Sequence, residues 1–194
     1  MGIVAVTNED SEMKRGMIDI ETLSSHPDAA VLSIGLVGFD EDDIVYKSGI
    51  AIGVADWHGH IDPRTIQWWM QQSKEAQDYS FNHTSPWTAK DAATQLAGFA
   101  DEYCQKECWA NGPQFDLVVL RKWWNRTTGN DKFPIHYRNY RDCKTLWKIA
   151  EANGLDLQPH FHSVKGAAHD PMVDAERQAK AVQAAIKYLK LGAT

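Results

Sequence analysis

Several common classes of protein are excluded by what this 194-residue sequence lacks. It carries only three cysteines, Cys104, Cys108 and Cys143, and so sparse and odd a number does not build the disulfide framework of a small secreted domain. Its apolar runs stay well short of the roughly 20 residues that a membrane-spanning helix needs. The first 15 residues also lack the apolar centre of a signal peptide. We therefore expect a protein of the reducing cytoplasm that has no membrane partner.

Positive charge is scarce as well. The chain has 20 lysines and arginines against 26 aspartates and glutamates, which gives a formal net charge of −6. This balance argues against a protein that binds nucleic acid through bulk positive charge. It leaves open an enzyme in which bound cations reverse the local field.

The sequence also lacks internal repeats, low-complexity tracts and linkers rich in proline or serine. A chain of this length is most simply one domain with a sizeable core. We expect a flexible, polar lead-in over residues 1–15, followed by a single domain over 16–194.

Apolar patterning predicts an α/β protein with a mixed central sheet flanked by helices. Three strands joined by short connections come first and indicate an antiparallel meander; a fourth strand and most of the helices follow. The predicted strands cover 17–22, 30–39, 44–54 and 107–111, and the predicted helices cover 63–72, 88–106, 115–124 and 142–152. The last helix is the clearest, with one apolar stripe formed by Ala175, Ala179, Val182, Ile186 and Leu189.

The first predicted strand contains two acids in an otherwise apolar run, GMIDIETLS. On a strand, Asp19 and Glu21 point to the same face, where two like charges repel unless a cation lies between them. Carboxylate oxygens are the ligands that Mg²⁺ and Mn²⁺ prefer. Taken alone, the strand is equally compatible with acids that face water at a sheet edge.

Two later segments supply further acids in apolar surroundings. In HDPMVDAERQA, Asp170 and Pro171 suit the start of the last helix, Asp174 lies about one turn in, and His169 stands just before the helix. Asp116 lies between Phe115 and Leu117 after a Gly-Pro turn. Each acid alone is explained by helix capping or a solvated edge. Together with a histidine base they match the needs of a metal-dependent phosphodiesterase.

The ordered motifs MIDIET, NGPQFD and HDPMVD resemble those of the DEDDh 3′–5′ exonucleases of the ribonuclease H-like superfamily. The stretches TIQWWMQQSKEAQ and YRDCKTL are similar to a phage and prophage branch, which includes DexA-type exonucleases, exodeoxyribonuclease VIII-like proteins and a mycobacterial exoribonuclease. The resemblance runs from about Gly16 to Leu189 and implies a bacterium or a phage-infected host. Two departures, Pro171 and Asp170 where a small residue and Asn are usual, remove no ligand.

The resemblance implies a mechanism with two divalent cations, Mg²⁺ or Mn²⁺, and release of nucleoside 5′-monophosphates from a 3′ end. The catalytic residues it implies are Asp19, Glu21, Asp116, His169 and Asp174, and the four acids among them are the metal ligands it implies. Asp19 would bridge the cations and His169 would act as the general base. Thr22 and Leu23 would hold the terminal nucleotide, with the leucine side chain wedged at the bases.

The polymer that the enzyme degrades is not fixed by the sequence. The phage branch favours single-stranded DNA, and the same site would serve an exoribonuclease. A catalytically inactive nucleic-acid-binding module is the alternative from another class, and a homodimer is left open. The pairs His58/His60 and His160/His162 would form a zinc site only with further ligands.

Two segments mix basic and aromatic residues, RKWWNR at 121–126 and YRNYRDCK at 137–144. Such segments line nucleic-acid grooves or form solvated basic faces, and the sequence does not separate these readings. Adjacent tryptophans occur at 68–69 and 123–124, and within a helix one member of each pair is expected in the core.

Overall fold

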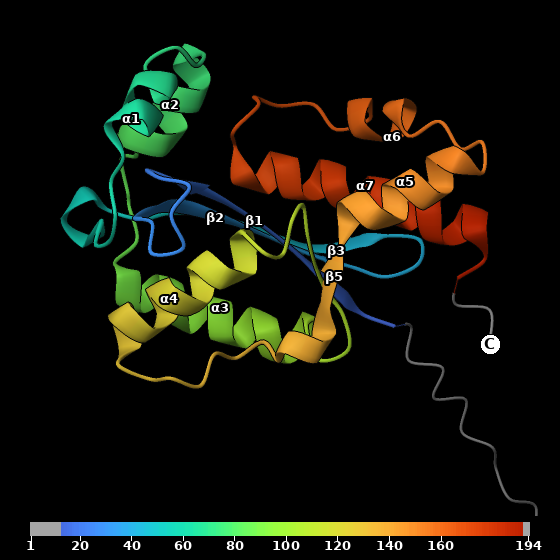
Figure 1. Ribbon diagram of the computed structural model, residues 1–194, viewed down its shortest axis with the longest axis horizontal. Helices are drawn as coiled ribbons and strands as arrows, with labels where there is room; N and C mark the ends of the chain where they lie inside the picture. Colours follow the sequence, from blue (N-terminus) through green and yellow to red (C-terminus); the bar gives the residue numbers. More distant parts are fainter. Residues whose placement is uncertain (1–12, 192–194) are drawn as a thin grey trace, which may run out of the picture.

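A computed structural model describes residues 13–191, and its centre is a five-stranded mixed sheet in the order β3-β2-β1-β4-β5 (Figure 1). Most of the predicted lead-in lies outside the described residues, and the first strand begins at Arg15. β1 pairs antiparallel with β2 and parallel with β4, β2 pairs antiparallel with β3, and β4 pairs parallel with β5. The strands are β1 (Arg15–Thr22), β2 (Val31–Phe39), β3 (Ile44–Ala51), β4 (Cys108–Ala110) and β5 (Tyr140–Asp142).

Helices cover both faces of this sheet. β2 is buried along its whole length, and its sequence VLSIGLVGF is nearly continuous in apolar residues, as expected of a strand covered on both sides. The α-helices are α1 (Pro63–Trp69), α2 (Lys74–Phe81), α3 (Ala89–Tyr103), α4 (Asp116–Thr128), α5 (Cys143–Ala152), α6 (Gln158–His162) and α7 (Pro171–Leu189). Two short 3₁₀ helices complete the chain: η1 (Val54–Asp56) lies between β3 and α1, and η2 (Tyr137–Asn139) lies between α4 and β5.

The core has one layer on each side of the sheet. On one side, α3 and α4 pack on β1 and β2, with Leu96 and Trp123 among the buried residues. On the other side, α5 and α7 pack on the same strands, with Val182 and Ile186 buried (Figure 1). The predicted α/β class, the antiparallel meander and the apolar stripe of the last helix are therefore confirmed.

The observed boundaries correct several predicted ones. The third strand ends at Ala51, not at 54, because Ile52 leaves the ladder and pairs in an isolated bridge with Trp87. The helix expected over 88–106 ends at Tyr103. The sequence did not reveal α2, α6 and β5, since each is too short for a clear apolar period.

No helix formed by residues 13–191 combines the length and the apolar character that crossing a membrane would require.

Candidate active site

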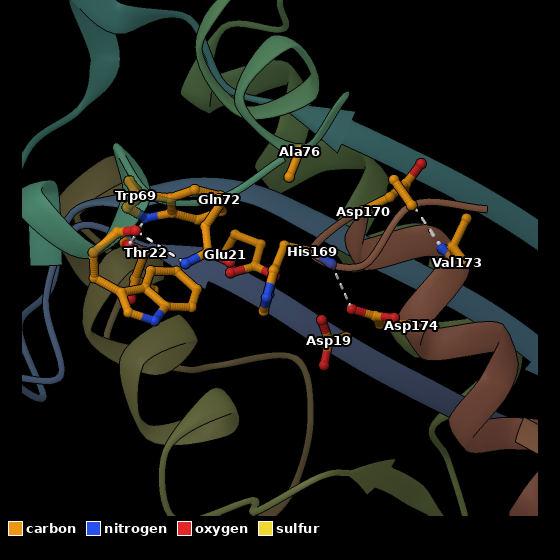
Figure 2. Close-up of polar contacts among 12 residues, drawn as sticks. Asp19, Glu21, Thr22, Trp69, Gln72, Ala76, His169, Asp170, Val173 and Asp174 are labelled. Carbon is orange, nitrogen blue, oxygen red and sulfur yellow. Dashed lines mark hydrogen bonds and ion pairs between the residues drawn. The ribbon is translucent and has the colours of Figure 1, made fainter. Parts of the chain in front are cut away.

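The two acids of β1 lie on one face of the central strand. Asp19 stands opposite Gly35 of β2 and Glu21 stands opposite Ser33, so both side chains point toward the start of α7 (Figure 2). The amide Nε2 of Gln178 donates to Asp19 Oδ1 over 2.7 Å. Glu21 Oε1 lies 3.3 Å from Nδ1 of His169.

The first turn of α7 fixes the histidine and the last acid. Asp170 caps the helix through its Oδ1, which accepts the backbone N–H groups of Met172 and Val173, and Pro171 opens the first turn. This confirms the predicted start of the helix. His169 has a φ of 64°, and this left-handed turn lets its N–H donate to Asp174 Oδ2 over 2.9 Å (Figure 2).

A glycine in β2 allows α7 to come this close. A Cβ placed on Gly35 would lie 2.0 Å from the backbone oxygen of Pro171, inside any permitted contact. Glycine at this position therefore lets the helix start rest directly on the strand. The contact brings His169 and Asp174 within reach of the β1 acids.

Asp116 enters from the opposite layer as the first residue of α4. It is 5% exposed, and its backbone N–H is bonded to the carbonyl of Gly112 in the turn that precedes the helix. An acid in the first turn of a helix is stabilised by the helix dipole.

All five predicted catalytic residues line one cavity of about 430 Å³, which we call the acidic cavity. The residues in question are Asp19, Glu21, Asp116, His169 and Asp174. They come from β1, α4 and the start of α7, three segments distant in the sequence. The remaining wall includes Phe115, Trp147 and Phe161.

The acidic cavity concentrates negative charge out of water. Burial, followed by repulsion from Asp116 and Glu21, raises the pKa of Asp19 well above its ordinary value. Burial also raises the pKa of Glu21, against the opposing effect of His169, and raises the pKa of Asp116 to about 7. The hydrogen bond to Glu21 in turn raises the pKa of His169.

This donor set fits hard divalent cations. Carboxylates that repel one another in a partly buried cavity are stabilised by a cation bound between them. Among residues 13–191, the group whose potential ligand atoms converge within 4.8 Å is Glu21, His169 and Asp174. The predicted zinc alternative, at His58/His60 or His160/His162, gains no such group within the described chain.

Two further residues of the cavity were not singled out by the sequence. Arg177 donates from Nη1 to Asp174 Oδ1 over 2.8 Å, and it also bonds the carbonyls of Val164 and Gly166. Gln178 is 5% exposed, and its buried Oε1 has no hydrogen-bond partner among residues 13–191. Both lie about one helical turn beyond Asp174, and this spacing is the signal that could have identified them.

The two residues predicted to hold the terminal nucleotide, Thr22 and Leu23, are not part of the lining of the acidic cavity. The Oγ1 of Thr22 donates to the carbonyl of Ser24, and the Thr22 carbonyl accepts the indole N–H of Trp69 (Figure 2). Leu23 is 3% exposed and packs in a small core with Trp69 and Ala76. The structure does not bring either residue into the acidic cavity, and a wedge role would require the leucine side chain to leave this core.

The tryptophan pairs follow the expected division. Trp69 and Trp123 are buried, at 2% and 1% exposure. Trp68 is 41% exposed, and its ring stands edge-on to the imidazole of His169 with 4.8 Å between the centroids. An exposed aromatic face therefore lies at the rim of the acidic cavity.

Comparison with known proteins gives one family. The model of the 3′–5′ exoribonuclease Rv2179c-like domain matches residues 14–186. No curated protein matches the sequence.

Solved structures share the fold at low identity. The ExoI/SSB-Ct complex aligns with a TM-score of 0.66 and 12% identity, covering 93% of this chain and 42% of that chain. The nuclease domain of 3′hExo, a DEDDh family member bound to rAMP, aligns with a TM-score of 0.59 and 11% identity, covering 94% of both chains. Pop2p of S. pombe, in its Mg²⁺- and Mn²⁺-bound form, aligns with a TM-score of 0.57 and 13% identity, covering 88% of this chain and 82% of that one. These likenesses confirm the predicted ribonuclease H-like fold, and the chain spans under half of the ExoI chain.

Proposed function

From the premise that this chain belongs to the Rv2179c-like 3′–5′ exoribonuclease domain family, and is a 3′–5′ exonuclease, we propose that the acidic cavity is its catalytic site. The observation that carries the proposal is the convergence of Asp19, Glu21, Asp116, His169 and Asp174 on one cavity. The family match confirms the predicted enzyme class. The phage or prophage branch and the single domain over 16–194 stay predictions.

Divalent cations, Mg²⁺ or Mn²⁺, are the cofactors that this donor set suits. The residues that would hold them are the four acids of the cavity, Asp19, Glu21, Asp116 and Asp174. When bound, such cations activate the attacking water and stabilise the leaving oxygen of the phosphodiester. Gln178 keeps one oxygen of Asp19 in place, and Arg177 keeps one oxygen of Asp174 in place.

His169 is proposed to take the proton from the attacking water. Its Nδ1 faces Glu21 in this structure, and a raised pKa favours the protonated ring, which is no base. A Glu21 carboxylate held by a cation would give up this hydrogen bond, which is the largest cause of the raised histidine pKa. The hydrogen bond from the backbone N–H of His169 to the Asp174 carboxylate keeps His169 at the cavity.

Single-stranded nucleic acid is the proposed substrate, with nucleoside 5′-monophosphates as products. The family description places RNA first, whereas the phage-branch resemblance favours single-stranded DNA as the second candidate. A pocket that accepts or excludes the 2′-hydroxyl separates the two. A cytoplasmic location and a monomeric or homodimeric state belong to the same proposal.

The test uses 5′-labelled RNA and DNA of one sequence, incubated with Mg²⁺, Mn²⁺ or EDTA. Laddering from the 3′ end that stops with EDTA and in Asp19→Asn supports the proposal. Asp43→Asn is the matched control, because it removes one carboxylate charge from the exposed turn between β2 and β3. A protein that degrades neither polymer with either metal would be the inactive binding module instead.

A further inference from the structure

The two basic and aromatic segments left open by the sequence meet on one face of the molecule. Arg121, Lys122 and Asn125 of α4 line a groove of about 460 Å³ together with Asp131 and Tyr140. A second hollow of about 320 Å³ shares Arg121, Asp131 and Tyr140. It extends the groove to Lys132, His136 and Tyr137.

Arg121, Lys122 and Lys132 line these hollows, and Arg138 and Lys144 belong to the adjoining basic and aromatic segment; we call these five cations the α4 strip. All five are exposed. Within residues 13–191 none of them forms an ion pair, whereas Lys14, Lys47 and Lys187 on other faces each pair with a carboxylate. The acid in the groove, Asp131, accepts a hydrogen bond from Asn125. The strip therefore carries local positive charge on a chain whose net charge is −6.

The groove begins where the acidic cavity ends. Asp116 lines the cavity as the first residue of α4, and its neighbours Leu117 and Val118 line the groove. Along α4, the nine residue steps from Asp116 to Asn125 rise about 14 Å, the length of about four stacked nucleotides.

Exposed rings stand at the far end of the groove. Tyr137 is 60% exposed, and its ring centroid lies 4.6 Å from that of His136. The guanidinium of Arg138 lies 5.9 Å from the Tyr137 centroid. Aromatic faces beside cations are the elements with which proteins stack the bases and hold the backbone of single strands.

We propose that the α4 strip binds the single-stranded substrate on the 5′ side of the scissile phosphate, while its 3′ end lies in the acidic cavity. This inference rests on the proposed function for the direction of the strand. The contacts are to phosphates and base faces, so they carry no sequence preference. Affinity accordingly grows with strand length until the groove is filled.

The test is equilibrium binding in EDTA, which prevents hydrolysis by a metal-dependent nuclease, measured by fluorescence anisotropy with labelled RNA and DNA strands. Strands of about 4 and about 12 nucleotides are compared over a salt series. We expect the wild-type chain to bind the longer strand about tenfold more tightly. The double variant Arg121→Gln/Lys122→Gln should lose this gain, and its slope of log affinity against log salt should fall by about 1.4, or about 0.7 per lost phosphate contact.

The control is Lys90→Gln/Lys190→Gln, which removes the same charge from two exposed lysines that are not part of the groove lining. We expect it to keep the wild-type length dependence. An unchanged length dependence in Arg121→Gln/Lys122→Gln, or an equal loss in the control, would contradict the proposal that the α4 strip binds the substrate. The proposed function fails separately, in the hydrolysis assay, if the wild-type chain shortens neither strand with Mg²⁺ or Mn²⁺.

Discussion

At the scale of the residue, Gln178 holds the acid on which the proposed site is centred. Its amide donates to Asp19 over 2.7 Å, and its Oε1 faces the cavity wall without a partner in the described chain. A buried acceptor left unpaired costs free energy, so a role is needed that offsets it. Positioning a metal-binding carboxylate is such a role.

We predict that Gln178→Leu lowers both Mn²⁺ affinity and kcat/KM by about 10- to 100-fold, because the Asp19 carboxylate loses its fixed orientation. Calorimetry and a hydrolysis assay measure the two effects. Gln183→Leu is the matched control, since Gln183 is equally buried on α7 but bonds the carbonyls of Asp40 and Asp43 in a distant turn. Equal Mn²⁺ affinities in the wild type and Gln178→Leu would contradict the positioning role.

His169 presents a different case at the same scale, because its side chain lies near the proposed metal ligands while its proposed role is to accept a proton. We predict that His169→Ala loses about 10²- to 10⁴-fold in kcat, as removal of a general base does, while Mn²⁺ binding is retained. Single-turnover kinetics and calorimetry separate the two properties. Loss of Mn²⁺ binding in this variant would make His169 a ligand.

At the scale of the element, the start of α7 is placed by its contact with β2. Gly35 leaves no room for a side chain beneath Pro171, so the strand and the helix touch through their backbones. The first turn of α7 carries both His169 and Asp174 to the cavity. A small shift of this one helix therefore changes the positions of two of the five proposed catalytic groups.

We predict that Gly35→Ala lowers the free energy of unfolding by about 1–3 kcal/mol through overpacking and lowers kcat/KM as α7 moves away from β1. Thermal unfolding and hydrolysis measure these effects. Gly98→Ala is the control: a Cβ there meets no atom within 4 Å, and on α3 it should stabilise the chain by about 0.5–1 kcal/mol. A fully active, fully stable Gly35→Ala would show that the contact is not needed.

At the scale of the whole molecule, the acidic cavity makes stability depend on pH. The pKa values of Asp19, Glu21 and Asp116 are raised in the folded chain, that of Asp116 to about 7, as is that of His169. The folded state then binds more protons than the unfolded state. The free energy of unfolding consequently falls as the pH rises from the ordinary carboxyl values through these raised ones.

We predict that the Tm of the metal-free protein falls between about pH 5 and about pH 8, and that Mn²⁺ raises Tm most at the upper end, where the carboxylates are free of protons. Thermal unfolding in EDTA and in Mn²⁺ at several pH values tests both statements. Asp116→Asn should flatten the metal-free curve, because it removes one of the titrating groups. A metal-free Tm that climbs over this range would contradict the raised pKa values of the cavity acids.

Sequence reasoning reached the elements with long, regular periods. The apolar run of β2 and the stripe of α7 are visible in the residues themselves, and both formed as expected. It missed α2, β5 and α6, whose short lengths are stabilised by contacts that a local pattern does not contain. The burial of Leu23 against Trp69 was also not foreseen, and its predicted contact with the substrate stays a prediction.

The sequence by itself determined that Asp19 and Glu21 share a face and that Asp170 caps the last helix, because the period of a strand and the chemistry of a cap are local properties. Only the tertiary structure decided that Asp116, His169 and Asp174 join them, since the contact of Gly35 with Pro171 and the crossing of α4 link segments far apart in the chain. The same holds for the α4 strip. Its two segments can be recognised in the sequence as mixtures of basic and aromatic residues. The groove between them exists because the chain folds back from α4 to β5.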